Sequence, residues 1–177
     1  MTSGMKIRTR MCMSLDGCVT TSDGWPAQLA DPNFSPEGYG FDEFQRSLDA
    51  VLMGRTTFEP AVHAERWPWP GLDVFVLASH RPEGTPDSVV VESDPERLLG
   101  RIRDANRGGD VHLVGGPRTI ETFRAIGALD HLGLIVLPLV IGDGMRLTPP
   151  LSVDAKLRLS SAQPLGGGLV ELVYDIA

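Results

Sequence analysis

The stretch Val51–Phe58, with the sequence VLMGRTTF, decides how this chain is organised. It consists of a short apolar run, typical of a buried strand, and then a glycine, an arginine and two threonines. Val111–Thr119, VHLVGGPRT, repeats the plan with a glycine pair, and its proline is favoured in the first turn of a helix. Two strand ends of this kind indicate one phosphorylated ligand.

Other apolar runs bounded by turn residues predict further strands. They are short, almost unbroken and rich in β-branched residues, so they fit a mainly parallel sheet covered on both faces by helices. The expected strands are residues 5–13, 51–53, 74–78, 89–91, 111–114 and 132–141. The expected helices are residues 41–48, a helix capped by Asp94 that stops at Gly108, and one from Pro117 to Gly127. Two alternating stretches, 156–160 and 169–176, predict a C-terminal hairpin at the sheet edge.

Length and composition restrict the class of protein. A chain of 177 residues fits a single domain, 1–177, with one core. A net charge of −7 offers no general field for nucleic acid or an anionic membrane. No apolar run approaches the roughly 20 residues that span a bilayer, so a cytoplasmic location is expected. Cys12 and Cys18 lack the spacing of a zinc or redox site, and we expect no metal.

The glycine pair Gly115 and Gly116 predicts an anion site. Glycines let a ligand approach the backbone, and the helix that follows presents free N–H groups and its positive dipole end. Arg118 and Thr119 add donors. The alternative is that the pair forms only a tight strand-to-helix turn.

Gly54, Arg55 and Thr56 strengthen the anion hypothesis, because arginine offers a fixed fork of donors to a phosphate monoester. Ser79–Arg81 follows another strand and supplies further donors. Ligands of open α/β sheets bind outside the carboxyl ends of the strands, so these groups should share one edge. Two phosphate sites on one edge suggest NADPH. The alternative is that Arg55 and Arg81 are solvated surface charges.

Ser14–Gly17 places a carboxylate, Asp16, at the end of the first strand. An acid there could orient a substrate or help deliver a proton, but an Asp-Gly turn is the common structural alternative. The segment 20–40 is long and irregular, as lids and binding loops often are. Residues 138–144 are interpreted as a structural turn.

Together, Ser14–Gly17, Met53–Glu59, Val114–Pro117 and Pro138–Gly144 resemble the dihydrofolate reductase-like superfamily. Within it, the chain is similar to the C-terminal reductase domain of the bifunctional riboflavin-biosynthesis deaminase-reductase, in a stand-alone form. The resemblance covers about residues 6–174.

The resemblance implies a three-layer α/β/α sandwich, a mostly parallel central sheet with a C-terminal antiparallel hairpin, and a homodimer. It implies an oxidoreductase that transfers a hydride from NADPH to a small heterocycle, either a riboflavin-pathway compound like 5-amino-6-(5-phosphoribosylamino)uracil or a pterin-like one. Arg55, Thr56 and Ser79 would then meet the 2′-phosphate. The pyrophosphate would lie on Gly115, Gly116, Arg118 and Thr119, with Gly54 beside them, and Leu15, Asp16 and Gly17 would lie near the nicotinamide.

Two positions depart from that pattern. Dihydrofolate reductases carry a carboxylate on the helix before the Gly-Arg-x-Thr strand, whereas this chain has Gly40 near that place and Phe41 and Phe44 facing inward. The riboflavin enzyme usually has an acid before its glycine pair, whereas this chain has Val114. The alternatives are therefore a non-catalytic NADP(H)-binding module and a flavin-binding oxidoreductase.

Overall fold

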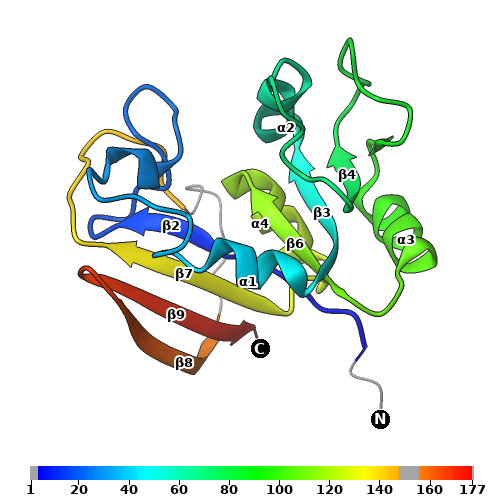
Figure 1. The fold of residues 1–177 in the computed structure, drawn as a ribbon. Helices are drawn as coiled ribbons and strands as arrows, with labels where there is room; N and C mark the ends of the chain where they lie inside the picture. Colours follow the sequence, from blue (N-terminus) through cyan, green and yellow to red (C-terminus); the bar gives the residue numbers. More distant parts are fainter. Residues whose placement is uncertain (1–3, 148–155, 177) are drawn as a thin grey trace. The chain divides into compact units, whose positions relative to one another are not determined.

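The computed structural model of the chain describes residues 4–147 and 156–176 (Figure 1). These residues form two compact units. Of these residues, unit 1 comprises 4–8 and 47–130, and unit 2 comprises 9–46, 131–147 and 156–176. In the part of the chain that is described, no helix combines the length and apolar character needed to span a membrane.

Unit 1 contains a parallel sheet in the order β5-β4-β3-β6-β1. Its strands are β1 (Ile7–Arg8), β3 (Leu48–Gly54), β4 (Asp73–Leu77), β5 (Val90–Glu92) and β6 (Asp110–Gly115). In register, Gly54 lies beside Leu77 on one side, and Met53 lies beside Gly115 on the other. The carboxyl ends of three neighbouring strands therefore meet at one edge, as the sequence predicts.

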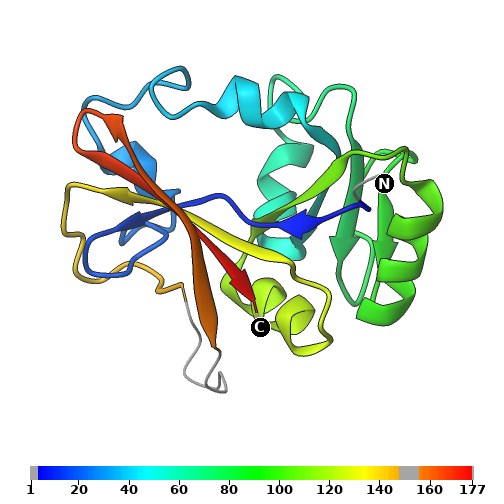
Figure 2. The same cartoon turned by 90° about the horizontal axis from the view of Figure 1, so that it is seen from below.

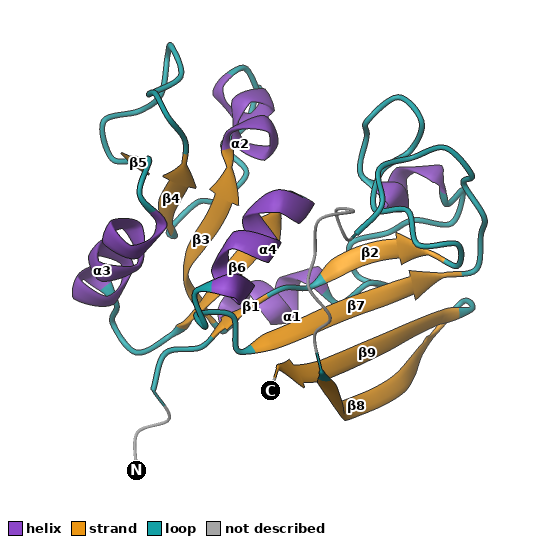
Figure 3. Cartoon of the chain, turned by 180° about the vertical axis from the view of Figure 1, so that it is seen from behind, coloured by secondary structure: helices purple, strands orange, loops and turns teal. Residues whose placement is uncertain are grey.

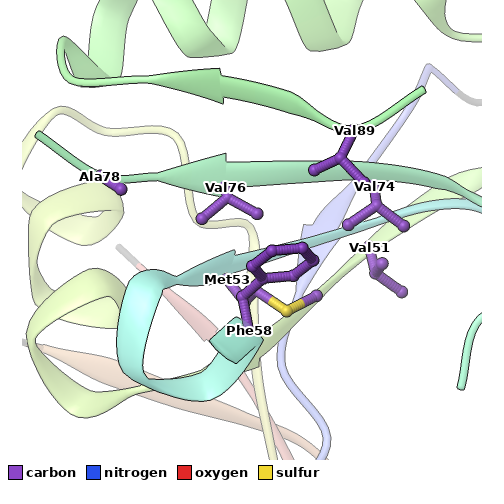
Figure 4. Close-up of a cluster of buried hydrophobic side chains, with 7 residues drawn as sticks. All are labelled: Val51, Met53, Phe58, Val74, Val76, Ala78 and Val89. Carbon is purple, nitrogen blue, oxygen red and sulfur yellow. The ribbon is translucent and has the colours of Figure 1, made fainter. Parts of the chain in front are cut away.

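Helices α2 (Arg55–Val62), α3 (Pro95–Ala105) and α4 (Pro117–Ala125) pack on this sheet (Figure 3). Phe58 of α2 lies among valines and Met53 of the central strands (Figure 4). The crossover from β5 through α3 to β6 runs back over the sheet, and right-handed crossovers then place α3 on the opposite face. The sheet of unit 1 thus has helices on both faces.

The cluster around Phe58 is extended by the irregular segment after α2. The rings of Trp67 and Trp69 lie 6.4 Å from Phe58 and 5.5 Å from each other, measured between centroids. Val114, on β6, packs against the same cluster. These contacts fix the start of α2 relative to β3.

Unit 2 contains β2 (Met11–Ser14), β7 (His131–Leu137), β9 (Leu169–Ile176) and β8 (Leu157–Gly166). β2 and β7 are parallel, and β7, β9 and β8 are antiparallel neighbours, so the chain ends in a hairpin, drawn in orange and red in Figure 2. The unit also contains a 3-10 turn, Ala27–Ala30, and the short helix α1 (Phe41–Arg46). Tyr39, fully buried, anchors the segment 20–40 on the sheet.

The expected fold class, α/β with a mostly parallel sheet and a C-terminal hairpin, is confirmed. So is the helix after Asp94, whose carboxylate accepts the Arg97 N–H at 2.9 Å. The helix expected over 41–48 ends at Arg46, because Leu48 is buried as the first residue of β3. The helix α2 was not predicted.

The strand expected over 5–13 is interrupted between β1 and β2. At the interruption the Thr9 hydroxyl donates to the Gly133 carbonyl at 3.1 Å and accepts the Gly133 N–H at 3.0 Å. A Cβ on Gly133 would lie 2.5 Å from the Thr9 carbonyl oxygen, so only glycine fits there. The Thr9 hydroxyl thus makes the hydrogen bonds to Gly133 that backbone groups would make in a continuous strand.

Candidate functional site

The strand-end rim of unit 1 collects most of the predicted site. We define this rim as Gly54, Arg55, Thr56, Ser79, Gly115, Gly116, Arg118 and Thr119. Each of these residues lies at, or within four residues of, the carboxyl end of β3, β4 or β6. Because the three strands are parallel neighbours, the sheet itself brings these residues together.

The two glycine junctions of the rim are in direct contact. A Cβ added at Gly54 would lie 2.5 Å from Thr119 Oγ1, which is closer than real Cβ atoms approach an oxygen. A Cβ at Gly116 would lie 3.8 Å from Thr57 Oγ1. Each glycine therefore faces the threonine of the other junction.

Both helices that leave these junctions begin at a glycine, which has no side chain to cap the first N–H groups. Gly54 is the N-cap of α2 and Gly116 is the N-cap of α4, and neither makes a side-chain cap hydrogen bond. Gly115 has a φ of 154° and is joined to Gly116 by a cis peptide bond. Two helix N-termini with their positive dipole ends side by side form an environment that favours an anion.

The side chains of the rim differ in exposure. Arg55, Thr56, Ser79 and Arg118 are exposed, whereas Thr119 is buried. Arg55 Nη1 donates to Glu59 Oε1 at 2.6 Å, one helical turn along α2, and both side chains are 43% exposed. Exposed pairs of this kind contribute little stability, so the guanidinium remains available for a stronger partner.

Arg81, expected to be a phosphate ligand or a solvated charge, makes structural hydrogen bonds. Its Nη1 donates to the Val89 carbonyl at 2.9 Å and its Nη2 donates to the Pro86 carbonyl at 2.5 Å. These bonds close the loop between β4 and β5. The phosphate role anticipated for Arg81 is therefore not supported by its contacts.

Leu15, Asp16 and Gly17 lie in unit 2, on the turn that follows β2. Leu15 is 71% exposed, and Gly17 has a φ of 90°, a conformation suited to glycine. The side chain of Trp25 is also exposed, at 62%, and the backbone N–H of Trp25 donates to Thr21 Oγ1. Leu15 on this turn and Trp25 on the segment that follows it thus present apolar side chains to solvent.

The Asp16 carboxylate ties this turn to the one after β7. It accepts hydrogen bonds from the Ser14 hydroxyl at 2.5 Å, the Ile141 N–H at 3.1 Å and the Gly142 N–H at 2.8 Å. The turn at 138–144 is thus the partner of Asp16 across about 125 residues of sequence. Ser14 is fully buried, so its hydroxyl is held in place for this contact.

The same hydrogen bonds stabilise the ionised form of Asp16. The Ser14 hydroxyl first, and then the backbone N–H of Ile141, lower the pKa of Asp16 from 3.8 to about 2. The carboxylate is therefore ionised at neutral pH. These contacts favour a role in positioning the turn, and the proton-donor role expected for Asp16 stays a prediction.

The two departures noted in the sequence have a structural counterpart. Val114 is part of the apolar packing around Phe58, and Gly40 has a φ of 65° and precedes α1 directly. Asp42 and Glu43, the acids of α1, are exposed. Within the described residues no group of three histidine, cysteine or acidic side chains could hold a metal ion.

Comparison with known proteins places this arrangement in a family. The model of the RibD C-terminal domain matches residues 5–171 of the chain. The chain belongs to the RibD C-terminal domain family. The match spans both units and contains every residue of the strand-end rim.

Relatives of this RibD C-terminal domain protein share its fold at low identity. The uncharacterised protein YwjB of Bacillus subtilis (strain 168) is 27% identical over 172 residues, which covers 93% of this chain and 94% of the relative. A putative riboflavin biosynthesis protein from Shewanella sp. PV-4 superposes with a TM-score of 0.78 at 21% identity, covering 98% and 99% of the two chains. Dihydrofolate reductase from Enterococcus faecalis, in complex with NADP(H) and RAB-propyl, superposes with a TM-score of 0.67 at 17% identity, covering 97% and 96%.

The contact between the two junctions predicts the effect of Gly54→Ala. The new methyl group would meet Thr119 Oγ1, and overpacking of this kind costs about 1–3 kcal/mol of unfolding free energy. Chemical denaturation followed by circular dichroism measures the loss. In the double variant Gly54→Ala/Thr119→Ala the clash partner is gone, so the total cost should be smaller than the sum of the single costs.

Gly100→Ala is the matched control, because nothing lies within 4 Å of a Cβ at Gly100 in the interior of α3. It should stabilise the protein by about 0.5–1 kcal/mol. Additive costs in the double variant at Gly54 and Thr119 would show that the two junctions are not in contact.

The hydrogen bonds of Asp16 predict a pH-dependent effect of Asp16→Asn. The folded-state pKa lies below 3.8, so the carboxylate contributes stability that is fully present above about pH 5 and is lost as the pH falls toward 2. The melting temperature of the variant should lie below that of the wild type at pH 7, and the gap should narrow between pH 4 and pH 2.5. Asp23→Asn, at an exposed carboxylate of the same unit, serves as the control. A gap that stays constant with pH would contradict the assigned contacts.

Proposed function

We propose that this chain is an NADPH-dependent reductase that transfers a hydride to a small heterocyclic substrate. The observation that carries the proposal is the apposition of two uncapped helix N-termini on the strand-end rim, with Arg55 at the first position of one helix. Membership of the RibD C-terminal domain family supports it. Of the two structural neighbours described above, one is named as a riboflavin biosynthesis protein and the other holds NADP(H).

The residues of the rim fit the two phosphate groups of the cofactor. Arg55, with Thr56 and Ser79, offers donors to the 2′-phosphate, and the guanidinium can leave Glu59 for a dianion because their pair is exposed. Gly115 and Gly116 let a pyrophosphate approach the backbone N–H groups at the start of α4. Arg118 and Thr119 add donors on the same helix.

The chain's part in the reaction is to bind, orient and exclude water, while NADPH supplies the hydride when bound. Leu15 and Gly17 belong to a turn whose shape depends on the Asp16 carboxylate. We assign Leu15–Gly17 to the nicotinamide end of the cofactor. Because Asp16 is ionised at neutral pH, an ordered water is a better proton source than this carboxyl.

The second candidate function is an NADP(H)-binding module without turnover. It is favoured by Val114 and Gly40, which occupy positions where the resemblance to related reductases implies substrate-binding acids. Stopped-flow measurement of NADPH oxidation on adding pyrimidines, pterins or quinoid compounds separates the two. A flavin-binding oxidoreductase would be identified by the visible absorbance of the purified protein. The single domain and the cytoplasmic location remain predictions.

The role of Arg55 predicts selective loss of NADPH binding in Arg55→Ala. A charge-assisted hydrogen bond to the 2′-phosphate is worth about 1.5–3 kcal/mol, so the affinity for NADPH should fall roughly 10- to 100-fold. NADH lacks this phosphate, so its affinity should change little. Calorimetric titration with both cofactors measures the difference, with Arg101→Ala on α3 as the control. Equal losses for NADPH and NADH would contradict the assignment.

The predicted homodimer has support from one face of the unit 2 sheet. Leu157, Leu159 and Val170 are exposed, at 43%, 53% and 37%. Leu157 pairs with Ile176 and Leu159 pairs with Tyr174 on that face, so the face is apolar along the hairpin. β8 is also the last strand of the described sheet. A second copy of this chain would bury the apolar face.

Leu159→Lys should therefore shift the protein from dimer to monomer in sedimentation velocity. Ser161→Lys lies on the same strand but faces the other way, opposite Val173, and should leave the dimer intact. A wild-type monomer at micromolar concentration, or a dimer that tolerates Leu159→Lys, would rule out this interface.

A further inference from the structure

Arg10 is a buried cation of unit 2 that the proposed function does not use. Its side chain is only 9% exposed. Nε donates to Glu171 Oε2 of β9 at 2.6 Å, and the guanidinium carbon lies 5.9 Å from the ring centroid of Phe41 and 5.3 Å from that of Phe44. The guanidinium is thus held at one nitrogen by a carboxylate and flanked by two aromatic rings of α1.

The hydrogen bonding of Arg10 is incomplete. Its Nη1 is buried and has no hydrogen-bond partner among the described residues. A buried N–H of a charged group without a partner is costly, and native proteins rarely keep one without a reason. Arg124 shows the contrast, because both its Nε and its Nη2 bond to Glu121.

Nη1 and Nη2 form the end edge of the guanidinium, whereas the Glu171 contact is made by Nε. Nη2 lies beside Gly40, where an added Cβ would be 3.3 Å away. Gly40 therefore brings backbone, and no side chain, to this edge. Two parallel N–H donors on one edge are the geometry that binds a carboxylate or a pair of carbonyl oxygens.

The cover over this edge is light. α1 has six residues, and none of them is buried. Segments with few buried contacts open locally at low free-energy cost, so a ligand can reach the guanidinium without global unfolding. Phe41 and Phe44 then offer aromatic faces to a planar ring.

We propose that Arg10 is a substrate-recognition residue that binds the carboxylate, or an equivalent pair of acceptor oxygens, of a planar heterocycle. This inference rests on the proposed function, since the heterocycle is the hydride acceptor. Arg10 gives this site a cation beside Gly40, flanked by the aromatic rings of α1. Heterocycles that present amino donors at that edge would face the N–H groups of Arg10 and should be rejected.

Calorimetric titration of the full chain, with and without saturating NADPH, tests this inference with two probes. Orotate carries a carboxylate and ring carbonyls, and 2,4-diaminopyrimidine presents amino donors. The wild type should bind orotate and should bind diaminopyrimidine at least about tenfold more weakly. The reverse preference, or no binding of either probe, overturns the proposal.

Three variants connect the binding to Arg10. Arg10→Met should weaken orotate at least about tenfold, and Arg10→Lys, which keeps the charge but loses the fork, should also weaken it. Glu171→Gln still accepts from Nε but no longer neutralises the guanidinium, so it should bind orotate more tightly. A purely structural ion pair predicts no tightening in Glu171→Gln. Arg124→Met is the control and should bind orotate like the wild type.

The affinity for NADPH is measured on every variant, because it distinguishes failure of the reductase proposal from failure of the role proposed for Arg10. If NADPH binds normally and the affinity for orotate is the same in the wild type, Arg10→Lys and Glu171→Gln, the role of Arg10 is overturned. The reductase proposal is then unaffected. If the chain does not bind NADPH but orotate binding weakens in Arg10→Lys and tightens in Glu171→Gln, the reductase proposal is overturned and the anion site at Arg10 is supported. If Arg10→Met fails to fold, Arg10→Lys and Glu171→Gln still decide the question.

Discussion

The close approach of Gly54 to Thr119 is the contact on which the candidate site depends. It exists because β3 and β6 are parallel neighbours, each strand ends in a glycine, and the helix after each strand has a glycine as its N-cap. With any larger residue at position 54 the two helix starts would be forced apart. The pairing of the strands therefore forms the rim. Its backbone N–H groups favour an anion, and its side chains add selectivity for a particular one.

Unit 2 is held by a different kind of contact. The ionised Asp16 carboxylate joins two turns, and its acceptors are occupied by backbone N–H groups and by the buried Ser14 hydroxyl. This carboxylate orders the backbone, because loss of its hydrogen bonds would leave the Ile141 and Gly142 N–H groups without a partner. Arg10 differs from Asp16 in the same unit, since one of its nitrogens remains without a partner. The complete hydrogen bonding of Asp16 fits a structural role, whereas the unpaired Nη1 of Arg10 fits the ligand-binding role that we propose for it.

Much of the fold and the rim could be predicted because the relevant signals are local. Strand–glycine–helix junctions, the Asp94 cap with Pro95, and the alternating C-terminal hairpin each lie within a few residues. The helix α2 was missed because it is short and contains Pro60. The backbone partners of Asp16, Ile141 and Gly142, could not be found because they lie about 125 residues away. Arg10 gave no distinguishing signal, because Lys6 and Arg8 are cations of the same stretch. Its burial depends on Glu171 and α1, which only the folded chain brings near.

The most direct test of the central claim is a calorimetric titration of the unaltered protein with NADPH and with NADH. We expect saturable binding of both cofactors at one site, with NADPH binding at least about tenfold more tightly because the rim pairs with its 2′-phosphate. Equal affinities for the two cofactors, or no binding of NADPH, would contradict it.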